Sequence, residues 1–223
     1  MSNTDSDSHS AAFAVPGALD PDLIEAARSL DAATLHEAAG KIGVMPPAIK
    51  PVVAGFKICG TAVPVQSTGG DNLWLHRALY EGRPGDVLVI HVSGQYEHGY
   101  WGEIMSTAAK ALGLAGMVID GCVRDVTLLQ QIGFPVFARG LCIRGTGKDF
   151  AATGRINAPT AFDDVIVYPG DLMVGDADGV VCIPRAQVPS VIEAAGRRAT
   201  READDCVRLA SNSISTLALY GWE

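Results

Sequence analysis

Two hydrophobic patterns alternate along the chain. Stretches whose apolar residues recur every three or four positions are typical of helices that bury one face, and short continuous apolar runs are typical of strands buried on both faces. Turn signals rich in Gly, Pro and Asp separate them. The predicted helices cover residues 21–30, 33–39, 72–80, 103–113, 126–132 and 188–209, and the predicted strands cover 52–65, 87–91, 117–119, 135–138, 141–144, 165–168 and 180–183.

This alternation predicts an α/β core that carries some antiparallel strands, because the turns at 169–171 and 176–179 favour hairpins. No repeat or linker divides the chain, so we expect a single domain over residues 16–223. Residues 1–15 are dominated by Ser and Asp and are expected to form a disordered tail. The last fourteen residues are weakly patterned.

The chain is organised around residues 99–125, which read as a loop, a helix and a strand. Asp120 and Gly121 are expected to end that strand with a turn. A helical crossover returns the chain parallel to its starting strand, and its hand is fixed. The two ends of this segment are therefore expected to lie side by side at one edge of a sheet.

Charged residues stand at both ends of the segment. Glu103 opens the helix, and Arg124 and Asp125 follow the strand. Together with free N–H groups at a helix start, this set can hold a divalent cation and a small carboxylate. The alternatives are ordinary: Glu103 complements the helix dipole, Asp125 caps the next helix, and Arg124 faces either a neighbouring carboxylate or a bound one.

Other candidate residues have structural explanations of equal weight. Asp71 and Asn72 stand at a second loop-to-helix junction, where capping is expected. His76 follows one helical turn later, and a lone His usually serves packing or the surface. Lys110 lies on the same helix face as Glu103, and this acid disfavours a Schiff-base role for it.

Several functional classes lack their motifs. No pair of His or Cys has the spacing of a zinc site. The segment G-T-G-K-D at 145–149 lacks the first Gly and the final Ser or Thr of a phosphate loop. Neither G-x-G-x-x-G nor G-x-S-x-G occurs, so nothing supports a dinucleotide fold or a serine hydrolase.

The composition limits the kinds of binding partner that we expect. The 223 residues carry a net charge of −8, which argues against nucleic acid and anionic membranes, and 48% of them are hydrophobic, which suffices for a core. The five Cys include no C-x-x-C pair, so we expect reduced thiols in the cytoplasm. The N-terminus lacks the features of a signal peptide, and no apolar run reaches the ~18 residues of a membrane span.

One spacing resembles the D/E-x20-R-D signature of the class II pyruvate aldolases: Glu103 is followed by twenty residues and then by Arg124-Asp125. These are the 4-hydroxy-4-methyl-2-oxoglutarate and 4-carboxy-4-hydroxy-2-oxoadipate aldolases of the RraA-like superfamily. The similarity extends in order along residues 30–210, through segments 71–76, 83–89, 98–103, 118–125, 169–171 and 176–181.

The resemblance implies a compact αββα-type sandwich similar to the swivelling phosphohistidine domain. It implies Mg²⁺- or Mn²⁺-dependent retro-aldol cleavage to pyruvate plus pyruvate or oxaloacetate, in aromatic-acid catabolism, with oxaloacetate decarboxylation as a side activity. It also implies a homotrimer or homohexamer that uses the C-terminal helix in its contacts and has its sites between subunits.

The resemblance also implies roles for particular residues. Asp125 would bind the metal directly, Glu103 would hold metal-bound water, and Glu202 of a neighbouring subunit would reach the metal's outer shell. Arg124 would bind the keto oxygen and stabilise the enolate. The substrate would also meet Gly102, Glu103, Ile104, Met105 and Asn72, with backbone N–H groups of residues 103–105 taking its carboxylate.

Two other functions remain open at this point. A non-catalytic RraA-type regulator that binds a ribonuclease shares the fold but lacks the complete acid and Arg-Asp signature. An oxaloacetate decarboxylase, or an aldolase for another 2-keto acid, would share the site and differ in the rest of the pocket.

Overall fold

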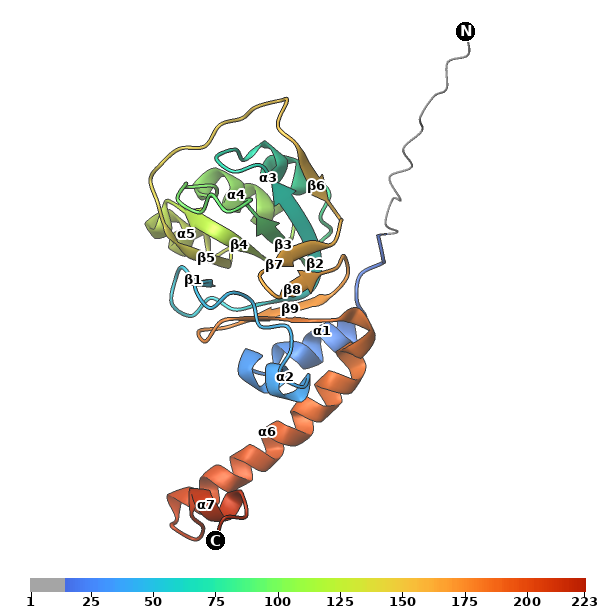
Figure 1. Ribbon diagram of the computed structural model, residues 1–223, viewed down its shortest axis with the longest axis vertical. Helices are drawn as coiled ribbons and strands as arrows, with labels where there is room; N and C mark the ends of the chain where they lie inside the picture. The colour runs from blue at the N-terminus through green and yellow to red at the C-terminus, as the bar shows by residue number, and fades with distance from the viewer. Residues whose placement is uncertain (1–14) are drawn as a thin grey trace, which may run out of the picture.

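The computed structural model describes residues 15–223, so the predicted tail at 1–15 falls almost wholly outside the described residues. The protein is a mixed α/β structure (Figure 1). Its helices are α1 (Pro21–Arg28), α2 (Ala32–Ala38), α3 (Leu73–Ala78), α4 (Glu103–Ala111), α5 (Val126–Ile132), α6 (Val188–Ala210) and α7 (Thr216–Leu219), with a 3-10 turn at Arg185–Gln187. Its strands are β1 (Lys50–Pro51), β2 (Ile58–Ser67), β3 (Asp86–His91), β4 (Gly116–Val123), β5 (Val136–Leu141), β6 (Gly154–Ile156), β7 (Thr160–Phe162), β8 (Val165–Val167), β9 (Leu172–Gly175) and β10 (Val180–Ile183).

One eight-stranded sheet forms the centre of the molecule. Its order is β1-β5-β4-β3-β2-β9-β10, and β6 pairs with β2 beside this path. Strands β2 to β5 are parallel, whereas β1, β6, β9 and β10 pair antiparallel. The expected α/β core with added antiparallel strands is therefore confirmed, and the parallel strands are buried on both faces, as their continuous apolar runs predict.

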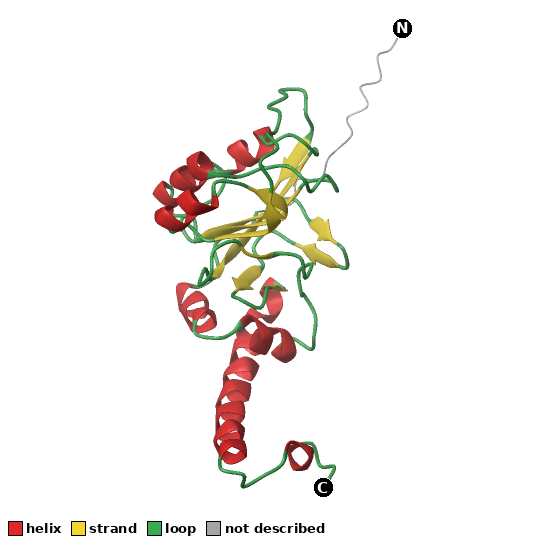
Figure 2. Cartoon of the chain, turned by 90° about the vertical axis from the view of Figure 1, so that its left-hand side faces the viewer, coloured by secondary structure: helices red, strands yellow, loops and turns green. Residues whose placement is uncertain are grey.

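The two faces of the sheet have different covers (Figure 2). Helices α3, α4 and α5 pack on one face, where Leu75, Met105 and Leu129 join alternate strand residues in one apolar cluster. The β7–β8 hairpin covers the other face, where Phe162 and Val167 belong to a second cluster. Each strand thus supplies both clusters by alternation.

A third apolar cluster joins α1, α2 and the first part of α6 to β9 and β10. Helix α6 buries Val188, Val191 and Ala195, and no residue of α6 after Ala195 is buried. From there the helix leads away from the sheet toward α7 and the C-terminus (Figure 1). We call residues 196–223 the C-terminal arm.

Several sequence expectations need correction. Strand β4 does not end at Asp120-Gly121 but continues to Val123, because buried Asp120 pairs with Arg139 of β5 at 2.5 Å. No separate strand covers 141–144, since β5 ends at Leu141. The β-rich stretch at 52–65 becomes a strand only at Ile58. The weakly patterned C-terminus contains α7, and the strands β1, β6, β7 and β9 were not predicted.

None of the helices in residues 15–223 combines the length and the apolar character that crossing a membrane requires.

Candidate functional site

The candidate site lies where the crossover β3–α4–β4 begins and ends. Strands β3 and β4 are parallel neighbours, so the loop before α4 and the turn after β4 meet at the same edge of the sheet. A pocket of about 310 Å³ opens there. Its lining contains every site residue predicted for a single chain, namely Asn72, Gly102, Glu103, Ile104, Met105, Arg124 and Asp125.

Asp125 connects the two ends of the crossover. It precedes α5 but makes no side-chain cap bond to that helix. Instead its Oδ2 accepts the backbone N–H of Glu103 at 3.1 Å, so the residue before α5 caps α4. Asp125 adopts left-handed backbone angles (φ 64°, ψ 34°), which Asp and Asn tolerate better than most other residues. These angles aim the carboxylate at the start of α4.

Arg124 is the cation of this corner. Its Nε lies 3.8 Å from Oδ2 of Asp125, and its backbone N–H donates to the carbonyl of Trp101 at 2.9 Å. The Arg124 side chain is 47% exposed, so it lies at the pocket surface rather than in the core. The structural interpretation, that Arg124 faces a neighbouring carboxylate, is therefore correct. Arg124 also lines the pocket.

Two glycines permit this close packing. A Cβ on Gly102 would lie 2.3 Å from Oδ2 of Asp125. A Cβ on Gly99 would lie 2.5 Å from the carbonyl oxygen of Cys142 and 3.0 Å from Cδ of Arg124. A side chain at Gly102 would displace the Asp125 carboxylate, and one at Gly99 would press on the Cys142 backbone and on the Arg124 side chain.

Buried aromatic residues hold the loop before α4. Tyr100 and Trp101 are 0% and 1% exposed. The Tyr100 hydroxyl donates to the Gln95 carbonyl at 2.5 Å and accepts the Gly70 N–H at 2.7 Å. Burial raises the pKa of Tyr100, which keeps this donor protonated. The loop is thus fixed before any ligand binds.

Asn72 offers a buried acceptor. Its Nδ2 donates to the Tyr100 carbonyl at 3.0 Å, and Asn72 is only 6% exposed. Its Oδ1 has no hydrogen-bond partner among the described residues. A buried, unpartnered oxygen in a pocket wall is suited to a hydroxyl or water donor.

The pocket also contains residues that the sequence did not single out for it. Gly99, Tyr100, Trp101 and Lys148 line it, and His76, which had an ordinary alternative, does so as well. Lys148 belongs to the G-T-G-K-D segment rejected as a phosphate loop. Its sequence position gave no sign that its loop returns to α3. Lys110 lies elsewhere, since its Nζ donates to the Ile132 carbonyl at the end of α5.

The oxygens at this corner fit a hard divalent cation. Asp125 and Glu103 are carboxylates, the ligand type that Mg²⁺ and Mn²⁺ prefer. Within residues 15–223, no three His, Cys, Asp or Glu side chains come together as a metal cluster. One chain thus supplies two carboxylates, Asp125 and Glu103. So few protein ligands suit Mg²⁺, which usually keeps several water ligands.

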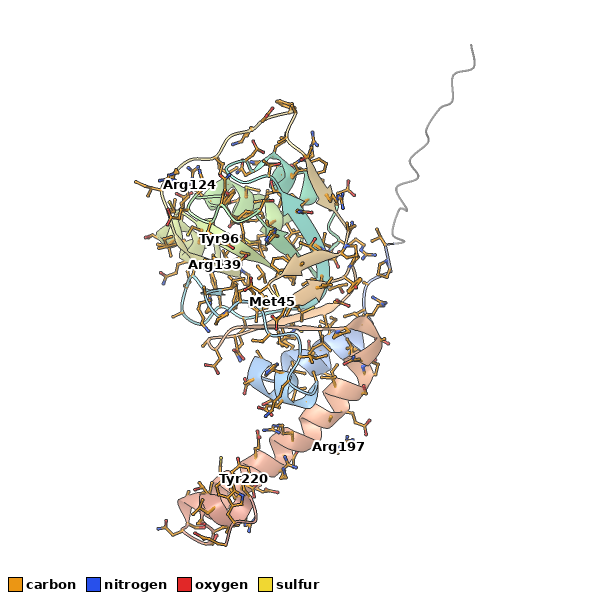
Figure 3. The ribbon with its side chains drawn as sticks, viewed as in Figure 1. Met45, Tyr96, Arg124, Arg139, Arg197 and Tyr220 are labelled. Carbon is orange, nitrogen blue, oxygen red and sulfur yellow. The ribbon has the colours of Figure 1, made fainter. Side chains whose placement is uncertain are left out.

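Glu202 is not part of this pocket. It lies on α6, where its Oε1 pairs with Nε of Arg198 at 2.8 Å. Figure 3 shows Arg124 on the sheet body and Arg197 and Tyr220 on the distant arm. A role for Glu202 at this site requires another subunit and stays a prediction.

Comparisons with known proteins agree with the fold. The model of the RraA-like family, described as Aldolase/RraA, matches residues 21–182. A Halalkalibacterium halodurans protein with the provisional name 4-hydroxy-4-methyl-2-oxoglutarate aldolase is 36% identical over 201 residues, which cover 90% of this chain and 93% of that protein.

Two solved structures are similar over most of their length. An uncharacterized protein from Pseudomonas syringae has 28% identity and a TM-score of 0.77, covering 93% of this chain and 98% of its own. Streptomyces coelicolor RraAS2, described as an unusual member of the RNase ES inhibitor RraA family, has 26% identity and a TM-score of 0.74, covering 85% and 98%. The chain is therefore a member of the RraA-like family, and the fold expected from the resemblance is confirmed.

Proposed function

We propose that this protein is a divalent-metal-dependent aldolase that cleaves 4-hydroxy-2-oxo acids and releases pyruvate. One observation carries the proposal. The Arg124 guanidinium, the Asp125 carboxylate and the N-terminus of α4 line a single pocket, and the two ends of one crossover supply them. Homologues that bear the provisional aldolase name support lyase chemistry.

The reaction needs a positive environment at one oxygen. When the C3–C4 bond breaks, its electron pair moves onto the pyruvyl half and forms an enolate. The C4 hydroxyl loses its proton and becomes a carbonyl, and C3 later takes a proton. Arg124 neutralises the charge that develops on the C2 oxygen, and loss of one such group typically costs ~10²–10³ in rate.

The remaining groups bind and orient the substrate. The N–H of Glu103, which was expected to help bind the C1 carboxylate, already donates to Asp125. The first-turn N–H groups of Ile104 and Met105 have no intrahelical acceptor and receive that carboxylate, together with the positive end of α4. The Oδ1 of Asn72 accepts a hydrogen bond from the C4 hydroxyl. The ordered Tyr100–Trp101 loop keeps these groups in place before binding.

Asp125 would hold Mg²⁺ or Mn²⁺ directly, and Glu103 would hold it through water. The neighbouring subunit's Glu202 would add an outer contact in a homotrimer or homohexamer. When bound, such a cation polarises the 2-keto acid's oxygens and lowers the pKa of its water. The proposed substrates are 4-hydroxy-4-methyl-2-oxoglutarate and 4-carboxy-4-hydroxy-2-oxoadipate, from aromatic-acid catabolism, with oxaloacetate decarboxylation as a side activity.

The test measures pyruvate with coupled lactate dehydrogenase. Each proposed substrate, and oxaloacetate separately, is supplied with Mg²⁺, with Mn²⁺ and with EDTA. We expect cleavage that EDTA abolishes and that added metal restores. Arg124→Ala should lower kcat by about 10²-fold or more, while Lys41→Ala, which removes an exposed cation in the turn after α2, should change nothing.

The outcomes separate the candidate functions. Decarboxylation without aldol cleavage would point to another substrate for the same site. The absence of both activities in the metal-loaded protein would overturn the proposal. It would favour a binding role, for which the description of Streptomyces coelicolor RraAS2 as belonging to an RNase inhibitor family is the specific support.

A further inference from the structure

His76 lies one helical turn after Asn72 in the wall of the candidate pocket. The His76 N–H donates to the Asn72 carbonyl at 3.2 Å, so the two side chains leave the same side of α3. Both of them line the pocket, together with Arg124 and Asp125. A group that the Oδ1 of Asn72 holds is therefore next to the imidazole of His76.

The half-buried imidazole of His76 has no protein partner that would occupy it. Among the histidines of residues 15–223, only His36 and His91 have ring nitrogens in hydrogen bonds. Burial lowers the pKa of His76, the charge of Lys148 lowers it further, and the charge of Asp71 opposes them. The ring is thus neutral at pH 7, and one of its nitrogens can accept a proton.

The other titratable groups of the pocket are unsuited to accept a proton at neutral pH. Arg124 and Lys148 offer only donors. Glu103 and Asp125 are the proposed metal ligands, and the buried hydroxyl of Tyr100 stays protonated. Among the described residues that line the pocket, only the histidine of α3 remains as a base.

Retro-aldol cleavage needs such a base at one atom. The C4 hydroxyl must lose its proton while the C3–C4 bond breaks. Arg124 and the α4 terminus act at the pyruvyl end, so neither of them removes this proton. Asn72 accepts the hydrogen bond of the hydroxyl, but an amide oxygen orients a proton without taking it up. The hydroxyl proton is therefore held on the α3 side of the pocket.

We propose that His76 is the general base that takes the proton of the C4 hydroxyl, while Asn72 orients that hydroxyl. As the O–H bond breaks, its electron pair forms the C4 carbonyl, and the C3–C4 electron pair moves onto the pyruvyl half as the enolate. His76 leaves this step as imidazolium and gives its proton to solvent, and C3 takes a proton from solvent. This assignment rests on the proposed function.

Two reactions of the same pocket form the enolate without a C4 hydroxyl. One is the decarboxylation of oxaloacetate, in which the bond to the departing CO₂ breaks. The other is the Mg²⁺-dependent exchange of pyruvate C3 protons with D₂O, followed by NMR. Cleavage of 4-hydroxy-4-methyl-2-oxoglutarate is thus the reaction of the three that needs a base at this hydroxyl.

His76→Gln keeps a polar side chain but removes the base. We expect kcat for cleavage to fall about 10²–10⁴-fold, the usual contribution of general base catalysis, with KM within about threefold of wild type. Decarboxylation and proton exchange should both stay within about twofold of wild type. His36→Gln, which replaces the histidine of α2 outside the pocket, is the matched control and should cleave normally.

The pH dependence gives an independent readout. Cleavage requires neutral His76, so kcat/KM should fall on the acid side through the pKa of His76, and His76→Gln should lose this acid limb. Lys148→Ala removes a charge that lowers this pKa, so the limb should move to higher pH. The His76 ring protons, titrated by NMR in metal-free protein, should shift in the same direction. Lys41→Ala and Asp164→Asn, which change exposed charges in the turn after α2 and in the β7–β8 turn, should leave the limb in place.

Failure of this assignment differs from failure of the proposed function. If metal-loaded wild type cleaves no 4-hydroxy-2-oxo acid, both are overturned. If wild type cleaves, only the assignment is overturned by a His76→Gln variant that cleaves normally, keeps the acid limb, or loses decarboxylation and exchange in proportion to cleavage. Should His76→Gln fail to fold, judged by its thermal midpoint, His76→Asn is assayed in the same three reactions.

Discussion

Gly102 leaves the least room for a side chain beside the charged residues Arg124 and Asp125. The Oδ2 of Asp125 would lie 2.3 Å from an added Cβ, well inside contact distance. Its backbone is extended (φ −162°), so a side chain causes no backbone strain. The only cost of a methyl group is displacement of the Asp125 carboxylate from the N–H of Glu103.

Gly102→Ala should therefore lower kcat for pyruvate release by about 10²-fold, since a shift of about 1 Å in a catalytic group is sufficient for that loss. The thermal midpoint should change little, because the displaced group is a flexible surface side chain. Gly17→Ala is the control, since nothing lies within 4 Å of its Cβ position. Undiminished turnover in folded Gly102→Ala protein would show that the Asp125 position is not critical.

At the scale of elements, Asp120 and Arg139 hold the end of β4 against β5. Asp120 is 3% exposed and accepts from Nε of Arg139 at 2.5 Å, and the guanidinium lies 4.0 Å from the Tyr96 ring centroid. Because the Tyr96 carbonyl in turn accepts the Cys122 N–H, this pair also supports the loop that leads to the site.

Asp120→Asn removes one charge of this buried pair and leaves the other. We expect the free energy of unfolding in urea to fall by about 3 kcal/mol, with Asp164→Asn within ~0.5 kcal/mol of wild type. A loss below ~1 kcal/mol would mean that Arg139 finds enough solvent to compensate.

The Asp120 pair also shows the limit of sequence reading. Continuous apolar runs predicted β3 and the first part of β4 correctly, because burial on both faces is a local property. The continuation of β4 depends on Arg139, a partner 19 residues away that a local D-G turn signal cannot show.

The same reasoning applies to the site. The charged corner was predictable because both of its ends belong to one crossover of fixed hand. The position of Lys148 was not predictable from the sequence. It depends on hydrogen bonds between residues 70–72 and the neighbours of Lys148, Gly147 and Asp149, which lie far away along the chain.

At the scale of the whole molecule, the C-terminal arm extends from the body (Figure 1) and carries exposed Val207, Tyr220 and Trp222. If Glu202 serves a neighbouring subunit's site, as we propose, each complete site draws on two chains. Asp125→Asn and Glu202→Gln are then defects in different halves of one interface.

Co-expression of these two variants with different affinity tags tests this arrangement. Each variant alone should have low activity, while doubly purified mixed oligomers should regain activity at the sites where both wild-type residues meet, which is about one site in three for a trimer and roughly one in four for a hexamer. Co-expression of Asp125→Asn with Arg124→Ala, two defects in the same half, is the control and should restore nothing. Equal activities in both mixtures would place the site within one chain.

The loop at 142–153 has an evolutionary consequence. It carries Lys148 but none of the crossover groups, and no helix or strand is formed within it. Because surface loops tolerate insertion and substitution better than the strands they join, a lineage can replace residues 145–153 and keep its bond-breaking apparatus intact, provided that Cys142 and Arg144 retain their backbone hydrogen bonds to Val123 and Gly99. Substrate preference and reaction type can thus diverge at separate rates, and swapping this one segment between relatives is a direct route to new specificities.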